Sequence, residues 1–415
     1  MLQTAWFKCT GFVWFITALA VFGSCEKGEE EKPEVFQLVR YDAVAVSKTN
    51  STQTWAHFMP WFVTPESSEN GAWGIHWTMN TRNPENRDEN GKREIASHFY
   101  PLTGPYASND PDVLAYQLLL MKYSGIDGVL IDWYGSSDWN DYKINRINAE
   151  ALIEALNETG LKFAIVYEDR TIPEVLKKDA SIDRVEAGIA DMNYLETNYF
   201  SRESYIHIDG RPLLLVFGPI EFRQASDWEE LFAPLSPEPL LLVLNGKSNE
   251  TRPVSSGEYI WVDQGSLDVK YGNKNQHDVF IGGAYPGFLD YYKEGGWGEG
   301  YFTIDHQLGK TFGETLLKAK NAGVDYLQLI TWNDYGEGTM IEPTDEFGFT
   351  FLEAVQDFSG VPYSKTELER IFEWYQMKVK SPSEKQKYFE QVFYYLVSLQ
   401  EEKAFYLLDS LNALH

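Results

Sequence analysis

Cysteine is nearly absent from this sequence of 415 residues, which contains only Cys9 and Cys25. Cys9 falls in an apolar leader, so a chain that starts at Cys25 has no partner for a disulfide bond and no cysteine cluster for a metal ion. The seven histidines show no H-x-x-x-H or H-x-H spacing, which argues against a zinc hydrolase. The G-x-S-x-G motif of many serine hydrolases is also missing. We therefore expect neither a metal ion nor another cofactor.

Basic side chains are scarce as well. Against 62 Asp and Glu there are 35 Lys and Arg, which gives a formal net charge of -27. Such a charge repels nucleic acid and anionic membrane surfaces. It does not argue against a neutral ligand. Aromatic residues reach 15%, with 13 Trp and 25 Tyr, and their flat faces suit stacking on sugar rings as well as packing in a core.

Long apolar runs are limited to residues 12–22, which follow Lys8 and are too short to span a bilayer comfortably. We interpret residues 1–24 as a signal peptide. The Gly23-Ser24-Cys25 ending resembles a bacterial lipobox, which implies a lipid anchor at Cys25 and a place in the cell envelope, as an outer-membrane lipoprotein or in the periplasm. Cleavage without lipid, or an uncleaved anchor, is the alternative. Residues 25–40, rich in Glu and Lys, predict an acidic tether.

Beyond the tether, apolar runs alternate with helical patterns, which is typical of repeated βα units. The expected strands cover residues 55–62, 128–134, 162–168, 212–217, 240–245, 259–263, 278–285 and 326–332. Helices are expected over 110–123, capped by Asp110, over 145–158, ended by Gly160, and over 311–321. The pattern predicts an α/β fold, a (β/α)8 TIM barrel over residues 41–362, with a small helical appendage over residues 363–415.

Polar side chains gather where these strands end. In a barrel the strand ends surround one pocket. The candidate substrate-binding residues are therefore His57, Asp132, Trp133, Tyr134, Tyr167, Glu168, Asn245, Asp263, Tyr285, Trp332 and Asn333, and the candidate stacking platforms are Trp73, Trp77, Trp133 and Trp297. His57 has an alternative interpretation as a hydrogen-bonded core residue, and Asp132 as a helix cap or a partner of Arg146. A carboxylate-rich rim without a basic cluster favours protonation of a leaving oxygen over phosphate chemistry.

The eighth strand ends in two carboxylates three residues apart, Asp334 and Glu337. On an extended strand this odd offset would send them to opposite faces. They cooperate only if the chain turns after Trp332, which Gly336 and Gly338 permit. In a turn, residues i and i+3 lie roughly 5–6 Å apart at Cβ, a range over which two carboxyl groups flank one glycosidic bond. The alternative is a polar loop that only closes the strand.

Several motifs carry a family resemblance. Residues 55–59 (WAHFM), 125–128 (GIDG) and 331–337 (TWNDYGE) are similar to glycoside hydrolase family 71, the α-1,3-glucanases. Residues 99–106 (FYPLTGPY), together with Asp110-Pro111 and Trp133, resemble family 99, the endo-α-mannosidases and mannanases. The similarity covers roughly residues 55–343, and the sequence resembles a bacterial group that lies between the two families.

By this resemblance, Glu337 is the catalytic acid and Asp334 the base or nucleophile-like group. Family 99 typically has Trp-Asn-Glu-Trp where this sequence has Trp332-Asn333-Asp334-Tyr335, so the shorter Asp sets its carboxylate further back. This favours room for a water and an inverting outcome like that of family 71 over the neighbouring-hydroxyl route of family 99. After Glu337, family 71 tends to continue Ser-His-Tyr and this sequence has Gly338-Thr339-Met340, so linkage specificity does not transfer.

We therefore predict a cell-envelope glycoside hydrolase that cleaves an α-linked glucan or mannan, with an oligo- or polysaccharide as its partner and no nucleic acid. Glu337 would protonate the glycosidic oxygen while Asp334 activates water. The Asp334 charge and the surrounding aromatic residues should raise the pKa of Glu337. A retaining endo-α-mannosidase is one alternative. A surface glycan-binding lipoprotein on a degenerate barrel is another, although degenerate barrels often lose one of the two carboxylates.

Overall fold

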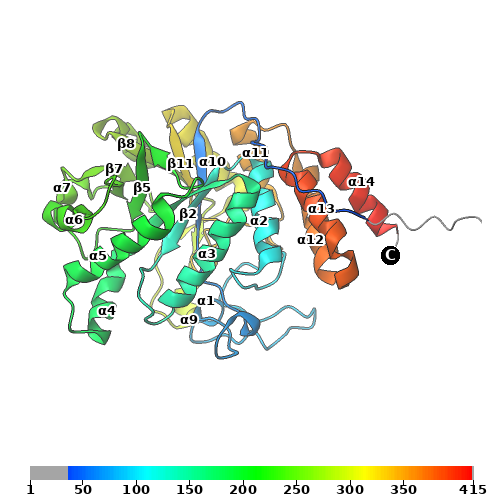
Figure 1. Cartoon of the computed structure of the whole chain (residues 1–415), viewed down its shortest axis with the longest axis horizontal. Helices are drawn as coiled ribbons and strands as arrows, with labels where there is room; N and C mark the ends of the chain where they lie inside the picture. Colours follow the sequence, from blue (N-terminus) through cyan, green and yellow to red (C-terminus); the bar gives the residue numbers. More distant parts are fainter. Residues whose placement is uncertain (1–35, 414–415) are drawn as a thin grey trace, which may run out of the picture. The chain divides into compact units, whose positions relative to one another are not determined.

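The centre of the fold is a closed sheet of eight parallel strands (Figure 1). The strands are β1 (Gln53–Phe58), β2 (Gly128–Trp133), β3 (Lys162–Tyr167), β5 (Arg211–Val216), β6 (Leu240–Leu244), β7 (Ser255–Tyr259), β8 (Val279–Ala284) and β11 (Tyr326–Leu329). They follow one another in the order β3-β2-β1-β11-β8-β7-β6-β5, and pairing of β3 with β5 closes the ring. The predicted TIM barrel is confirmed.

This computed structural model describes residues 36–413. Contacts separate residues 1–37 from residues 38–415, and the barrel with its helices belongs to the second of these units. The predicted signal peptide, Cys25 and most of the predicted tether lie outside the described residues. No helix within residues 36–413 has the length and apolar character needed to cross a membrane.

Helices surround the sheet. They are α1 (Ile75–Thr78), α2 (Pro111–Ser124), α3 (Tyr142–Thr159), α4 (Ile172–Lys178), α5 (Arg184–Leu195), α6 (Ala225–Phe232), α7 (Ser248–Thr251), α8 (Leu267–Gly272), α9 (Tyr292–Gly295), α10 (Lys310–Ala322), α11 (Thr350–Ser359), α12 (Lys365–Lys380), α13 (Gln386–Val397) and α14 (Glu401–Asn412). The expected cap of α2 is present, because the Asp110 carboxylate accepts the backbone N–H of Asp112 at 2.8 Å and of Val113 at 3.2 Å. Gly160 ends α3 in the left-handed conformation, at φ +74°.

Three further short strands occur within residues 36–413. β4 (His207–Ile208) pairs antiparallel with the start of β5, and β9 (Phe288–Leu289) pairs antiparallel with β10 (Thr303–Ile304). The C-terminal helices α12 and α13 pack on α2 and carry α14, in orange to red in Figure 1.

Register decides which side chains enter the barrel. On neighbouring strands Asp132 pairs with Val166 and Trp133 pairs with Tyr167. Paired residues point to the same side of a sheet and successive residues alternate. Asp132 and Glu168, which is two residues after Val166, therefore point inward, whereas Trp133 and Tyr167 point outward toward the helices.

The sixth barrel strand lies earlier than predicted. We expected residues 259–263, whereas β7 spans Ser255–Tyr259 and shares only Tyr259 with that range. The strand opens with Ser, Ser and Gly, a polar start without the apolar pattern that marks the other strands. It is held by β6 and β8 on its two sides. The strand ends four residues before Asp263, so Asp263 does not stand at a strand end.

Candidate active site

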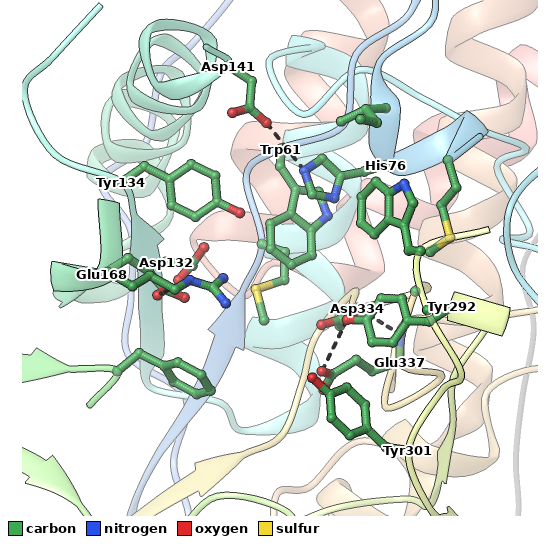
Figure 2. A pocket seen from close by; sticks show the side chains of 18 of the residues that line it. Trp61, His76, Asp132, Tyr134, Asp141, Glu168, Tyr292, Tyr301, Asp334 and Glu337 are labelled. Atoms are coloured by element: carbon green, nitrogen blue, oxygen red, sulfur yellow. Dashed lines mark hydrogen bonds and ion pairs between the residues drawn. The ribbon is translucent and has the colours of Figure 1, made fainter. Parts of the chain in front are cut away.

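A cavity of about 1130 Å³ opens at the C-terminal ends of the barrel strands. The predicted residues that line it are His57, Asp132, Tyr134, Glu168, Trp297, Asp334 and Glu337. Figure 2 shows Asp132 and Glu168 on one side of this cavity and Asp334 and Glu337 on the other. The barrel thus brings two carboxyl pairs from distant parts of the sequence to one space.

Asp334 and Glu337 sit on a loop that is closed by its own hydrogen bonds. The backbone N–H of Asp334 donates to Thr331 Oγ1 at 2.8 Å, and the N–H of Thr339 donates to the carbonyl of Asp334 at 3.2 Å. The N–H of Glu337 donates to Asp334 Oδ1 at 2.9 Å. The Asp334 carboxylate therefore accepts the backbone N–H of Glu337, which brings the two residues together. They are neighbours, as the predicted turn requires.

The turn depends on Gly338 more than on Gly336. Gly338 has φ +65°, and a Cβ atom there would lie 2.6 Å from the carbonyl oxygen of Leu289. Any other residue at 338 would be strained and would collide with the β9 backbone. Gly336 does not adopt a positive φ among the described glycines, and a Cβ atom there would meet its nearest neighbours at 3.4 Å.

Burial sets the protonation of this pair. It raises the pKa of Asp334 to about 6, although hydrogen bonds from the backbone N–H groups of Glu337 and Gly336 act in the opposite direction. Burial, and then the Asp334 charge, raise the pKa of Glu337 well above its usual range, partly offset by the hydroxyl of Tyr292, which donates to Glu337 Oε1 at 3.2 Å. Near neutral pH the pair therefore holds one proton, on Glu337, and one charge, on Asp334.

Asp132 and Glu168 form the second pair. Both line the same cavity, and Glu168 Oε2 lies 2.7 Å from Arg170 Nε. Burial raises the pKa of Glu168 to about 7, and burial together with the Glu168 charge raises the pKa of Asp132 well above its usual range. A retained proton and one guanidinium give this wall both donors and acceptors for sugar hydroxyls. The alternative partner of Asp132, Arg146, pairs with Asp138 instead.

Aromatic rings form the rim. Trp61 and His76 stack with centroids 4.2 Å apart and planes 3° from parallel, and His76 Nε2 lies 3.5 Å from Asp141 Oδ2 (Figure 2). Trp297 stands edge-on to His76 at 5.8 Å and is 37% exposed. Flat, partly exposed rings above buried carboxyl groups are what a sugar chain needs to lie across the mouth.

The remaining predicted residues do not line the cavity. Trp133 and Tyr167 point outward, and the Tyr167 hydroxyl donates to Asp191 Oδ2 at 2.7 Å. Asp263 pairs with Lys270 beyond the end of β7. Asn245, on the outer face, donates to Glu258 Oε2 at 2.8 Å.

Other predicted residues are buried behind the rim. The backbone N–H of Tyr285 donates to Thr315 Oγ1 at 3.2 Å, and Trp332 is fully buried. Asn333 holds the end of β1, because its Oδ1 accepts the N–H of Met59 at 2.8 Å and its Nδ2 donates to the Met59 carbonyl at 3.0 Å. Of the predicted platforms, Trp77 is fully buried and the indole N–H of Trp73 donates to Glu85 Oε1 at 2.6 Å.

Many residues that line the cavity were not predicted. Among them are Trp61, His76, Arg170 and Tyr292. Arg170 had a usable signal, since it lies two residues after a strand-end glutamate. Trp61 lies in the loop after β1, and His76 and Tyr292 lie in the short helices α1 and α9. Nothing in the sequence shows which of these rings will meet. Within residues 36–413, no group of three or more His, Cys, Asp or Glu side chains is arranged to hold a metal ion.

Known proteins with similar sequences include glycoside hydrolases. The family model for glycosyl hydrolase family 99 matches residues 50–239. The human and mouse glycoprotein endo-alpha-1,2-mannosidase-like proteins are 22% and 21% identical to this chain over 275 residues, or 60% of this chain. The match spans 58% of the length of these curated relatives.

Solved structures share the barrel. The family 99 endo-alpha-mannosidase from Bacteroides thetaiotaomicron superposes with a TM-score of 0.56 at 18% identity, covering 77% of this chain and 98% of that chain. A glycoside hydrolase-like protein superposes with a TM-score of 0.54 at 11% identity, covering 78% and 97%. The fold is thus a TIM barrel with a carboxyl-lined cavity at the C-terminal ends of its strands. The chain is similar in sequence to glycosyl hydrolase family 99 over residues 50–239, and it shares the barrel fold of that family's solved members.

Proposed function

We propose that this protein cleaves an α-linked polysaccharide, with α-mannan as the first candidate and α-glucan as the second. The observation that carries the proposal is the pair Asp334 and Glu337, which are joined through the Glu337 N–H on one loop and line the same cavity. Burial raises the pKa of both carboxyl groups, and that of Glu337 further through the Asp334 charge. The family 99 match supports mannose-type glycans as the substrate class. Asp132, Glu168 and Arg170 on the facing wall would hold hydroxyls of the sugar ring.

In this mechanism Glu337 gives its proton to the glycosidic oxygen as the bond to the anomeric carbon breaks. Asp334 takes a proton from a water, whose oxygen forms the new bond to that carbon, and the proton later returns to Glu337. Asp334 Oδ1 is occupied by the N–H of Glu337, which leaves Oδ2 to act on the water. Because aspartate is one methylene shorter than the glutamate typical of family 99, we favour inversion.

Two other functions compete with this proposal. A retaining endo-α-mannosidase would use the same two carboxyl groups, with the substrate's own neighbouring hydroxyl as the first nucleophile. A glycan-binding protein that does not cut would keep the aromatic rim without needing a protonated Glu337 beside an ionised Asp334. The retained pair favours an enzyme over a binding protein.

Purified protein incubated with α-mannan and with α-1,3-glucan should release oligosaccharides from one of them, and proton NMR in the first minutes should show the β anomer. Early α anomer would establish retention. Tight binding to either polysaccharide without release of oligosaccharides would overturn the hydrolase proposal and support the glycan-binding function.

We also propose that the protein is exported and lipid-anchored at Cys25, because the leader ends in Gly23-Ser24-Cys25. Cells fed labelled palmitate should incorporate label into the full-length protein, and a Cys25→Ser variant should carry none. Equal labelling of the variant, or no labelling of the parent chain, would refute the anchor.

A further inference from the structure

Glu342 is a buried carboxyl group behind the loop that carries Asp334 and Glu337. It is 1% exposed and does not line the cavity. Its Oε2 accepts the hydroxyls of Tyr106 at 2.7 Å and Tyr335 at 3.0 Å, and its Oε1 accepts Gln117 Nε2 at 2.6 Å. Within residues 36–413, no Lys, Arg or His pairs with it. Glu342 is therefore compensated only by three neutral donors.

These contacts reach both sequence neighbours of Asp334. Tyr335, which follows Asp334, donates to Glu342 directly. Asn333, which precedes Asp334, donates from Nδ2 to the Tyr106 hydroxyl at 3.2 Å, and that hydroxyl donates to Glu342. One carboxyl group thus holds the residues on both sides of Asp334.

The backbone of Glu342 also closes the loop. Its N–H donates to the carbonyl of Trp332 at 2.9 Å, next to the N–H of Ile341, which donates to the carbonyl of Thr331 at 3.0 Å. These two hydrogen bonds join the start of the segment from Thr331 to Glu342 to its end. Asp334 and Glu337 lie on the loop between them.

We propose that Glu342 is the positioning residue of the catalytic loop, fixing the direction of Asp334 and Glu337 through Tyr106, Tyr335 and Asn333. The proposal rests on the proposed function of the two carboxyl groups, and it adds a residue that does not touch the substrate. Removing the carboxyl group would leave three buried donors unpaired. The loop would then relax toward other partners, and a displacement of about 1 Å at the reacting groups costs about 100-fold in rate.

The test compares Glu342→Ala with Glu342→Gln. We expect the alanine variant to lower kcat about 100-fold while KM stays within about twofold. The glutamine variant should recover at least about tenfold of that loss, because its amide oxygen still accepts from the tyrosines. Gln117 Oε1 has no partner in the described chain, so Gln117 can turn its amide to accept the new N–H.

Glu258→Gln is the matched control. Glu258 is 4% exposed and lies away from the cavity. It likewise accepts three neutral donors, Asn245 Nδ2 and the N–H of Gly246 at 2.8 Å each and the N–H of Ser248 at 3.0 Å. Unlike Glu342 it also has a histidine nearby, with His277 Nε2 at 3.5 Å from its Oε2. It should lower the melting temperature and leave kcat unchanged. If Glu342→Ala does the same, or if glutamine restores nothing, Glu342 is only a stability residue.

Hydrogen exchange separates this inference from the proposed function. In Glu342→Ala the amides of Thr339, Ile341 and residue 342 itself should exchange faster than in the parent protein, and in Glu258→Gln they should not. If the parent protein cleaves no polysaccharide, the proposed function fails and the exchange rates alone decide whether Glu342 holds the loop. If Glu342→Ala does not fold, Tyr335→Phe replaces it, with the same faster exchange expected; unchanged exchange would overturn the proposal.

Discussion

Replacing Glu337 by glutamine should lower kcat on polysaccharide by about 10²–10⁴-fold, the usual contribution of a general acid. Glutamine keeps the size of the side chain, and its amide oxygen can still accept the Tyr292 hydroxyl that now donates to Oε1. Glu337 Oε2 has no partner in the described chain, so the substitution breaks no hydrogen bond. The loss would therefore come from the missing proton and not from a disturbed loop.

The leaving group offers a direct control. A glycoside with a dinitrophenolate leaving group needs no protonation to depart, so Glu337→Gln should lose much less activity on it than on polysaccharide. Glu250→Gln, on α7 and outside the cavity lining, serves as the matched amide variant and should behave as the parent protein does. Full activity of Glu337→Gln on polysaccharide would remove Glu337 from the acid role.

The barrel could be predicted because most of its strands have a clear local pattern. Runs such as Leu240–Leu244 are apolar throughout and buried, and glycines such as Gly160 mark helix ends. β7 could not be placed in this way. Its polar start becomes a strand through pairing with β6 and β8, so tertiary pairing and not local propensity makes it a strand.

The site was predicted only in part, for two physical reasons. Alternation along a strand separates Asp132, which faces the cavity, from Trp133, which faces the helices, and a strand predicted without its register does not reveal this difference. Rim contacts such as the Trp61–His76 stack join residues whose separation in space depends on loop geometry. Residues at strand ends are thus predictable as a set, whereas their directions and their loop partners are not.

Glu342 illustrates a further limit. It lies five residues after Glu337 in the same polar loop, and nothing in the sequence distinguishes it as buried. Only the positions of Tyr106 and Gln117, more than 200 residues earlier, show that its carboxyl group faces away from the cavity. A list of the carboxyl residues in this loop therefore identifies Asp334 and Glu337 as catalytic candidates. It would wrongly add Glu342, which does not face the cavity.

Asp334→Asn should lower kcat by about 10²–10⁴-fold as well, and the pH dependence should identify its role. In the parent protein the base must be ionised, so kcat should fall as the pH drops through the pKa of Asp334, which burial raises to about 6. The asparagine side chain still accepts the N–H of Glu337 but has no proton to gain. Its residual activity should therefore lack this acid limb, and an unchanged limb would assign it to another group.

A smaller side chain at the same position tests how the base is used. In Asp334→Ala the missing carboxylate leaves room for azide, which needs no deprotonation. If Asp334 activates water on the far side of the sugar, azide should restore turnover and give a β-glycosyl azide from an α-linked substrate that has an activated leaving group. If Asp334 instead deprotonates a hydroxyl of the substrate, azide cannot replace it, and turnover should stay low at any azide concentration. Rescue with an inverted product would establish the inverting mechanism. Failure of rescue, together with an early α anomer from the parent protein, would establish the retaining mechanism.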